Sequence, residues 1–122
     1  MKKKKKTQGL NDGYAICYRE LKNNDVDFSS KSNSRDDFSN AEEIVTLAYA
    51  EENRRDQDYE FAKANDRSLN LKIRTLLREE VTSDDSIVIQ GTLYNVIKLD
   101  YAKSDGVMYF YLEEDRKLAE SD

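Results

Sequence analysis

Three short apolar runs separated by two turn signals fill residues 86–114 and restrict the fold more than any other feature of the sequence. The runs cover residues 87–89, 93–99 and 107–112. Runs of 3 to 7 residues that are rich in β-branched and aromatic side chains favour strands over helices. Gln90-Gly91 separates the first two runs, and Asp105-Gly106, a strong hairpin signal, precedes the third. This stretch predicts an antiparallel β-meander.

Three further strands are predicted upstream. In residues 14–20, successive side chains would point to opposite faces of a strand. Residues 44–50 are apolar on both faces, as in a strand packed on both sides. Residues 69–74 show the clearest alternation, with one set of side chains in the core and the other in solvent. The expected core set is Leu69, Leu71 and Ile73, and the expected solvent set is Asn70, Lys72 and Arg74. A slip in the alternation at Val96-Ile97 predicts a β-bulge.

One helix is predicted over residues 53–65. Asn53 is its expected N-cap, and Asp56 would occupy the third helical position, where a carboxylate interacts favourably with the helix dipole. Asn65-Asp66 is expected to end the helix. Because its apolar residues do not form one stripe, we expect the helix to cover one end of a sheet or to project from it.

Six short strands with one short helix indicate a mainly β protein, a small and partly open antiparallel β-barrel or a sandwich. A chain of 122 residues is long enough for one such domain. Residues 13–114 are expected to form it. Residues 1–12 are expected to be a disordered basic tail, and residues 115–122 a C-terminal tail.

Two polar segments are expected to lie outside the core. The five lysines at residues 2–6 repel one another and should stay solvated, although they could also form an arm that contacts nucleic-acid phosphates. Residues 21–42 hold few apolar side chains and form a long connection, which is either flexible or functional. In the second case, Phe28 or Phe38 would anchor it to a partner or to a neighbouring subunit.

Histidine and cysteine, which build many catalytic and metal sites, are absent or nearly absent. The chain has no histidine, and its one cysteine, Cys17, lies in a predicted strand and is expected to be a buried apolar residue. Acidic residues gather at 36–37, 56–58 and 84–85 without the glycine of a calcium loop, so we expect solvated loop charges or helix-cap charges. We therefore expect no enzyme activity and no cofactor. No apolar run is long enough to span a membrane.

Aromatic residues on the last two predicted strands suggest a small nucleic-acid-binding barrel as an alternative function. Tyr109, Phe110 and Tyr111, with Tyr94 on the neighbouring strand, could stack bases as oligonucleotide-binding folds do. Few basic residues accompany them, and the acidic residues from Glu113 onward oppose a polyanion. The alternative is a purely structural role, in which these rings pack in the core and in subunit contacts.

Four segments between residues 44 and 114 together form a recognisable pattern. An alanine-rich strand at 47–50 precedes the helical DQDYEFA, an alternating strand ends near Arg74, and VIQGTLYNVI leads into the final hairpin. Gly91 and Tyr94 are its most telling positions. The combination resembles the small head-closure proteins, also called head–tail adaptors or stoppers, of tailed phages with long non-contractile tails.

The resemblance implies a small β-barrel whose subunits form a ring beneath the portal and connector, where they close the DNA-filled capsid and dock the tail. The implied partners are portal and connector (adaptor) ring proteins, a tail-terminator or tail-tube protein, and other copies of the chain, with packaged DNA nearby. The implied location is the head–tail joint of the virion, after assembly in the cytoplasm of a host bacterium. No membrane partner is expected.

The resemblance also favours residues 51–67 over residues 21–40 as the segment that reaches the channel. Arginines there would attract DNA phosphate, and exposed rings would contact the channel or a partner. The candidate residues are Arg54, Arg55, Arg67, Tyr59 and Phe61. The alternative is that the arginines form ordinary helical ion pairs. Their partners would then be Asp58, Glu60 and Asp66.

Overall fold

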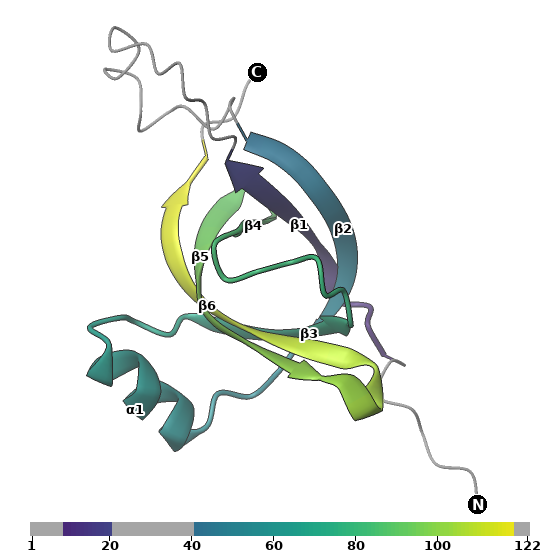
Figure 1. The fold of residues 1–122 in the computed structure, drawn as a ribbon. Helices are drawn as coiled ribbons and strands as arrows, with labels where there is room; N and C mark the ends of the chain where they lie inside the picture. The colour runs from purple at the N-terminus through teal and green to yellow at the C-terminus, as the bar shows by residue number, and fades with distance from the viewer. Residues whose placement is uncertain (1–8, 21–40, 119–122) are drawn as a thin grey trace, which may run out of the picture.

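In the computed structural model, which describes residues 9–20 and 41–118, six antiparallel strands form a closed barrel with one helix, α1, outside it (Figure 1). The strand order around the barrel is β1-β2-β3-β6-β5-β4. The elements are β1 (Gly13–Glu20), β2 (Ala41–Glu51), α1 (Asp56–Ala64), β3 (Leu71–Leu76), β4 (Ser86–Ile89), β5 (Thr92–Ala102) and β6 (Val107–Lys117). The predicted mainly β fold of about six strands and one short helix is confirmed.

Pairing of β1 with β4 closes the sheet. Cys17 lies opposite Ile87, and the neighbouring residues of the two strands pair in the same register. The structure is therefore a closed barrel. The sequence had predicted either a partly open barrel or a sandwich. Closure pairs both edges that an open sheet would expose.

The barrel interior is filled by inward-pointing side chains from all six strands. The buried core comprises Ala15, Cys17, Leu47, Tyr49, Ile73, Val81, Ile87, Ile89, Val96, Met108, Phe110 and Leu112. Val81 belongs to the segment between β3 and β4, which crosses one mouth of the barrel (Figure 1). Cys17 has no exposed surface, so the prediction of a buried cysteine is confirmed, and burial raises the pKa of its thiol to about 12.

Both turns of the β4–β6 meander occur where the sequence predicts them. Gln90 and Gly91 have φ values of 51° and 80°, the positive values that a two-residue hairpin turn needs. The second turn is a short 3-10 segment, Lys103–Asp105, followed by Gly106 at φ 73°. Only the glycine of the Asp-Gly pair therefore takes the left-handed conformation. The predicted bulge is also confirmed, because the β5–β6 register shifts between Val96 and Lys98.

The helix begins two to three residues later than predicted. Its N-cap is Arg55 rather than Asn53, and Asp56 is the first helical residue rather than the third. The third-position carboxylate is instead Asp58, whose Oδ2 accepts a hydrogen bond of 2.9 Å from the backbone N–H of Arg55. An acid at this position satisfies a backbone donor that the first helical turn leaves unpaired.

Three domain boundaries also differ from the prediction. Asp12 is not part of a free tail, because its N–H donates to the carbonyl of Tyr49 and its carboxylate accepts from the N–H of Glu51. β2 takes in the last two residues of the predicted 21–42 connection, and β6 extends to Lys117 by pairing with the start of β5. The predictions for residues 1–8, 21–40 and 119–122 lie outside the described residues. These include Phe28 and Phe38 as loop anchors.

Some residues that were expected in solvent are buried. Ile73 lies in the barrel core as predicted, but Lys72 on the opposite face is only 6% exposed, because α1 covers it. Leu69 precedes β3 and packs outside the barrel. Asp58 is a helix-cap charge, one of the two roles predicted for it, but it is buried rather than solvated, and Asp85 is buried as well. Asp85 accepts from Arg19 at 2.7 Å, which ties β1 to the segment before β4. No helix within the described ranges is long and apolar enough to cross a membrane.

Candidate functional site

The outer face of β3, β6 and β5 carries two rows of charged and aromatic side chains. Lys72, Tyr111 and Lys98 are direct cross-strand neighbours and form the first row. Arg74, Tyr109 and Asp100 form the second row. Side chains that lie opposite each other on one face of a sheet are close enough to interact. Accordingly, the Nζ atoms of Lys72 and Lys98 each lie 4.9 Å from the ring centroid of Tyr111.

The helix α1 packs on this face through a small apolar contact. Ala62 is the buried apolar residue of the helix, and it contacts Leu69 and Tyr111. Ile97 and Tyr109 pack against the edge of this cluster. Because a single alanine supplies the buried apolar surface of the helix, polar contacts must hold much of the interface together.

A buried ion pair supplies the main polar contact. The Nζ of Lys72 lies 3.0 Å from the Oδ2 of Asp58, and the two side chains are 7% and 4% exposed. Burial by itself raises the pKa of Asp58, but the hydrogen bonds from the N–H of Arg55 and from Lys72 lower it further than burial raises it. The pKa of Asp58 is therefore below its ordinary value, and the carboxylate is charged at neutral pH.

The first two predicted arginines lie in the linker before α1 and contact residues of the helix and of the segment before β3. The guanidinium of Arg54 donates to the carbonyl oxygen of Asn70 and lies 5.9 Å from the ring centroid of Tyr59. The guanidinium of Arg55 lies 3.6 Å from Asp58, as the helical-pair alternative predicts. The structure thus brings Arg54, Arg55 and Tyr59 together around the linker from β2 to α1.

The third predicted arginine, Arg67, lies at the other end of the helix. Asp66 takes the left-handed conformation with φ 60°, and the N–H of Arg67 bonds to the carbonyl of Ala62 at 2.8 Å, as in a Schellman motif. This turn directs Arg67 toward β6, where it pairs with Glu113 and lowers the pKa of that carboxyl group. Arg67 therefore ties the helix end to the barrel, and its partner is not a helical acid.

The two predicted aromatic contact residues are partly exposed on α1. Tyr59 is 43% exposed and Phe61 is 40% exposed. The Nζ of Lys98 lies 4.6 Å from the ring centroid of Phe61, so this lysine contacts both the helix and Tyr111 on β6. Tyr59 and Phe61 are consequently available to a partner without any change in the barrel.

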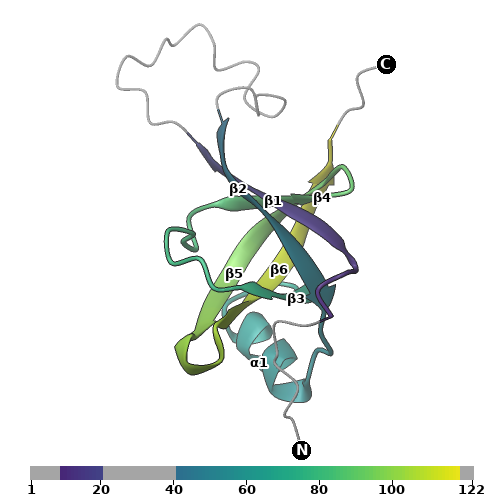
Figure 2. The same cartoon turned by 90° about the vertical axis from the view of Figure 1, so that its right-hand side faces the viewer.

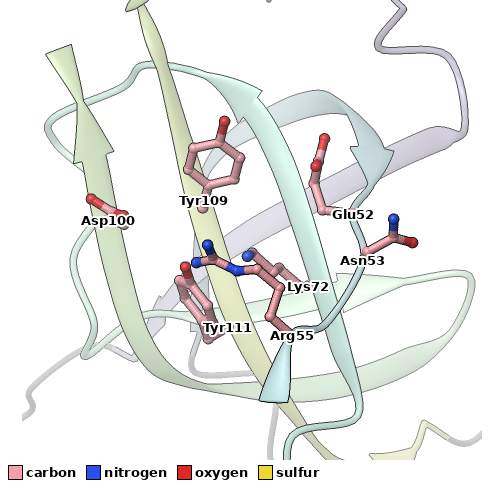
Figure 3. Close-up of a pocket in the computed structure, with 7 residues that line it drawn as sticks. All are labelled: Glu52, Asn53, Arg55, Lys72, Asp100, Tyr109 and Tyr111. Carbon is pink, nitrogen blue, oxygen red and sulfur yellow. The ribbon is translucent and has the colours of Figure 1, made fainter. Parts of the chain in front are cut away.

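The linker between β2 and α1 borders a cavity of about 420 Å³ on this face (Figure 3). Its lining residues are Glu52, Asn53, Arg55, Lys72, Asp100, Tyr109 and Tyr111. Figure 3 shows Arg55 reaching from the linker toward the two tyrosines, with Asp100 on the far side of the cavity. The Glu52 carboxylate pairs with Arg74, which was expected in solvent but is only 16% exposed.

Sequence patterns missed most of this cavity. Alternation correctly pointed Lys72 away from the barrel interior, but it could not reveal that a helix covers that face. A usable signal was the pair Tyr109 and Tyr111, two residues apart in β6 and therefore on one outward face. Outward aromatic residues on a barrel strand indicate that something packs over them.

The described residues hold no group of three or more acidic or cysteine side chains that could bind a metal ion. Comparison with models of protein families found no match, and comparison with curated protein sequences found none either. The site is thus defined by its own geometry, which consists of paired charges, two tyrosines and an exposed aromatic helix face.

Proposed function

We propose that this chain is a structural protein of the head–tail joint of a tailed phage. In this role its copies form a ring below the portal and connector, help to close the DNA-filled capsid, and dock the tail. The proposal starts from the resemblance of residues 47–50, 56–62, 69–74 and 87–99 to head-closure proteins. These four segments form the end of β2, α1, β3 and the β4–β5 hairpin.

The observation that carries the proposal is the way α1 is attached. α1 lies outside a barrel whose core it does not enter, and its contacts with the barrel are one buried alanine, one buried ion pair, the Arg67–Glu113 pair and partly exposed contacts of Phe61 and Arg54. A segment attached in this way can leave the barrel without exposing the main core. A closure protein needs such a segment, because the channel must be blocked before ejection and open during it.

The placement of the two ends of the molecule also supports an adaptor role. The ends of β1 and β2 that border residues 21–40 lie at one end of the molecule, and α1 lies at the opposite end (Figure 2). An adaptor has to contact one ring above it and another below it. Surfaces at opposite ends of a rigid barrel meet that requirement.

The alternative role, a small nucleic-acid-binding barrel, has less support from the aromatic residues. Phe110 has no exposed surface and Tyr111 is 4% exposed. Tyr94 packs against the barrel core. Stacking on bases needs exposed ring faces, so Tyr111 could serve only if α1 moved away.

The proposal can be tested by complementation in a phage or prophage from which the gene for this chain has been removed. The double variant Tyr59→Ser and Phe61→Ser alters the exposed face of α1 and leaves its buried contacts in place. We expect it to fold normally and to yield capsids that lose packaged DNA or fail to take tails. Electron microscopy of the purified particles would show the defect.

A matched control is the double variant Asp56→Ser and Glu60→Ser, which changes exposed polar residues of the same helix. It should support normal infectivity. Full infectivity of the aromatic double variant would remove α1 from the proposed mechanism. Genes for portal, capsid and tail-tube proteins beside this one would support the proposed role. Salt-dependent binding of single-stranded DNA at micromolar concentration, with no binding to a portal–connector complex, would favour the alternative.

A further inference from the structure

Two cations in the cavity beneath the β2–α1 linker have hydrogen-bond donors that no other described residue accepts. Lys72 has three ammonium donors and gives one to Asp58, while the rings of Tyr109 and Tyr111 lie beside its Nζ at 5.7 and 4.9 Å. Arg55 has five donors, and its guanidinium lies 3.6 Å from Asp58, which is longer than a hydrogen bond. Asp58 therefore does not satisfy both cations.

The other acidic residues of the cavity do not complete these contacts. Glu52 pairs with Arg74. Asp100 is exposed at the opposite side of the cavity, and within the described residues no ion pair joins it to a cation. The cavity thus presents donors near its linker side and an unpaired acceptor across from them.

The charge around the cavity discriminates between possible anions. Three carboxylates, those of Asp58, Glu52 and Asp100, line or adjoin it, so a phosphate dianion would meet strong repulsion. A carboxylate carries one charge and matches the planar fork of a guanidinium. The two tyrosine rings can pack against the methylene groups that carry a carboxylate, and Asp100 can accept from a peptide N–H.

We propose that this cavity binds the carboxylate of an aspartate or glutamate side chain from a partner protein, with Arg55 and Lys72 as donors. A volume of about 420 Å³ is large enough for an acidic side chain and part of its backbone. The site concerns the isolated subunit and does not depend on the proposed role at the head–tail joint.

The test is an NMR titration of the full chain with a blocked peptide, acetyl-Gly-Glu-Gly-amide. The isosteric acetyl-Gly-Gln-Gly-amide is the neutral control. The glutamate peptide should shift the amide signals of residues 52–55 and 109–111, and the glutamine peptide should not do so at the same concentration. Arg55→Gln should weaken binding of the glutamate peptide about tenfold or more. Lys63→Gln, which removes one charge from the exposed side of the same helix, should leave binding unchanged.

Three results would overturn the proposal. Arg55→Gln could bind the glutamate peptide as tightly as the unaltered chain while keeping the barrel amide pattern. Inorganic phosphate could bind at the same amides more tightly than the peptide, which would make the site a phosphate site. Acetate alone could bind as tightly as the peptide, which would make the ligand a free carboxylate. A virion assay plays no part in these results, so they are independent of the test of the proposed function.

Discussion

The Nζ of Lys72 on β3 and the Oδ2 of Asp58 on α1 lie 3.0 Å apart, with neither side chain more than 7% exposed. Asp58 also accepts from the backbone N–H of Arg55 at the N-terminus of the helix. One carboxylate therefore both caps the N-terminus of the helix and fastens the helix to the barrel. Removal of one partner of a buried ion pair leaves an uncompensated charge and costs about 3–5 kcal/mol.

We expect Asp58→Asn to release α1 while the barrel stays folded. The apolar contact of α1 is small. The free energy lost with the ion pair should therefore exceed the free energy of the remaining contacts that hold the helix on the barrel. Hydrogen exchange should become fast for the amides of Asp56–Ala64 and stay slow for those of β6. Asp56→Asn, two residues earlier and exposed, is the control and should leave both rates nearly unchanged. Equal loss of protection in α1 and β6 would mean that the helix is part of the cooperative barrel unit.

Acid should release the same helix. The pKa of Asp58 and that of Glu113 are both lower in the folded protein than their ordinary values. A carboxyl group with a lowered folded pKa stabilises the folded state above its unfolded pKa of about 4, and this contribution disappears as the pH falls through the folded pKa. Protection of α1 should therefore be constant from about pH 5 to 8 and decline below about pH 4. In the Asp58→Asn variant this decline should be much smaller.

The core can be tested with two positions on β3. Ile73 has no exposed surface and lies in the barrel core, so Ile73→Ala should destabilise the protein by about 2–5 kcal/mol. Leu76 on the same strand is 47% exposed, and Leu76→Ala should cost less than about 1 kcal/mol. Denaturant unfolding of both variants provides the comparison. Similar losses at the two positions would show that the register of β3 is misassigned.

For Arg74, the structure raises the expected free-energy cost of substitution by alanine. Sequence alternation placed it in solvent, where Arg74→Ala would cost about 0.5 kcal/mol or less. In the structure its side chain is 16% exposed and pairs with Glu52. We now expect a loss of about 1.5–3 kcal/mol, the range for hydrogen bonds to charged groups. Chemical unfolding that gives no measurable change for Arg74→Ala would contradict this pairing.

The turn before β6 requires a left-handed residue. Gly106 has φ 73°, and a Cβ atom built there would meet nothing within 4 Å. The cost of Gly106→Ala should thus come from backbone conformation alone, about 1–2 kcal/mol. Gly106→Asn should recover part of this loss, because asparagine tolerates the left-handed region better. Thermal unfolding of the two variants would show whether their order is as expected.

Local sequence signals determined the strands, the turns and the α-helix in the described part of the chain. Alternation and short apolar runs require extended backbone, the Gln90-Gly91 turn needs residues that accept positive φ, and the slip at Val96-Ile97 required a bulge. These features depend on neighbours in the chain, so they can be recognised without knowledge of the fold. The burial of Ile73 followed from the same alternation, and that of Cys17 followed from its residue type within a predicted strand.

Tertiary structure alone decided closure of the barrel and the nature of the cavity. Closure depends on the pairing of β1 with β4, which are about 70 residues apart, and nothing local specifies it. From the sequence alone, Lys72 and Asp58 would be expected to be solvent-exposed. In the structure, α1 folds over β3 and removes both charges from water. Whether a charged side chain is solvated or buried depends on what packs over it, and that is a property of distant segments. For this reason the arginines could be proposed from sequence, whereas the burial of Lys72 could not, and the tyrosines beside it were proposed only as base-stacking residues.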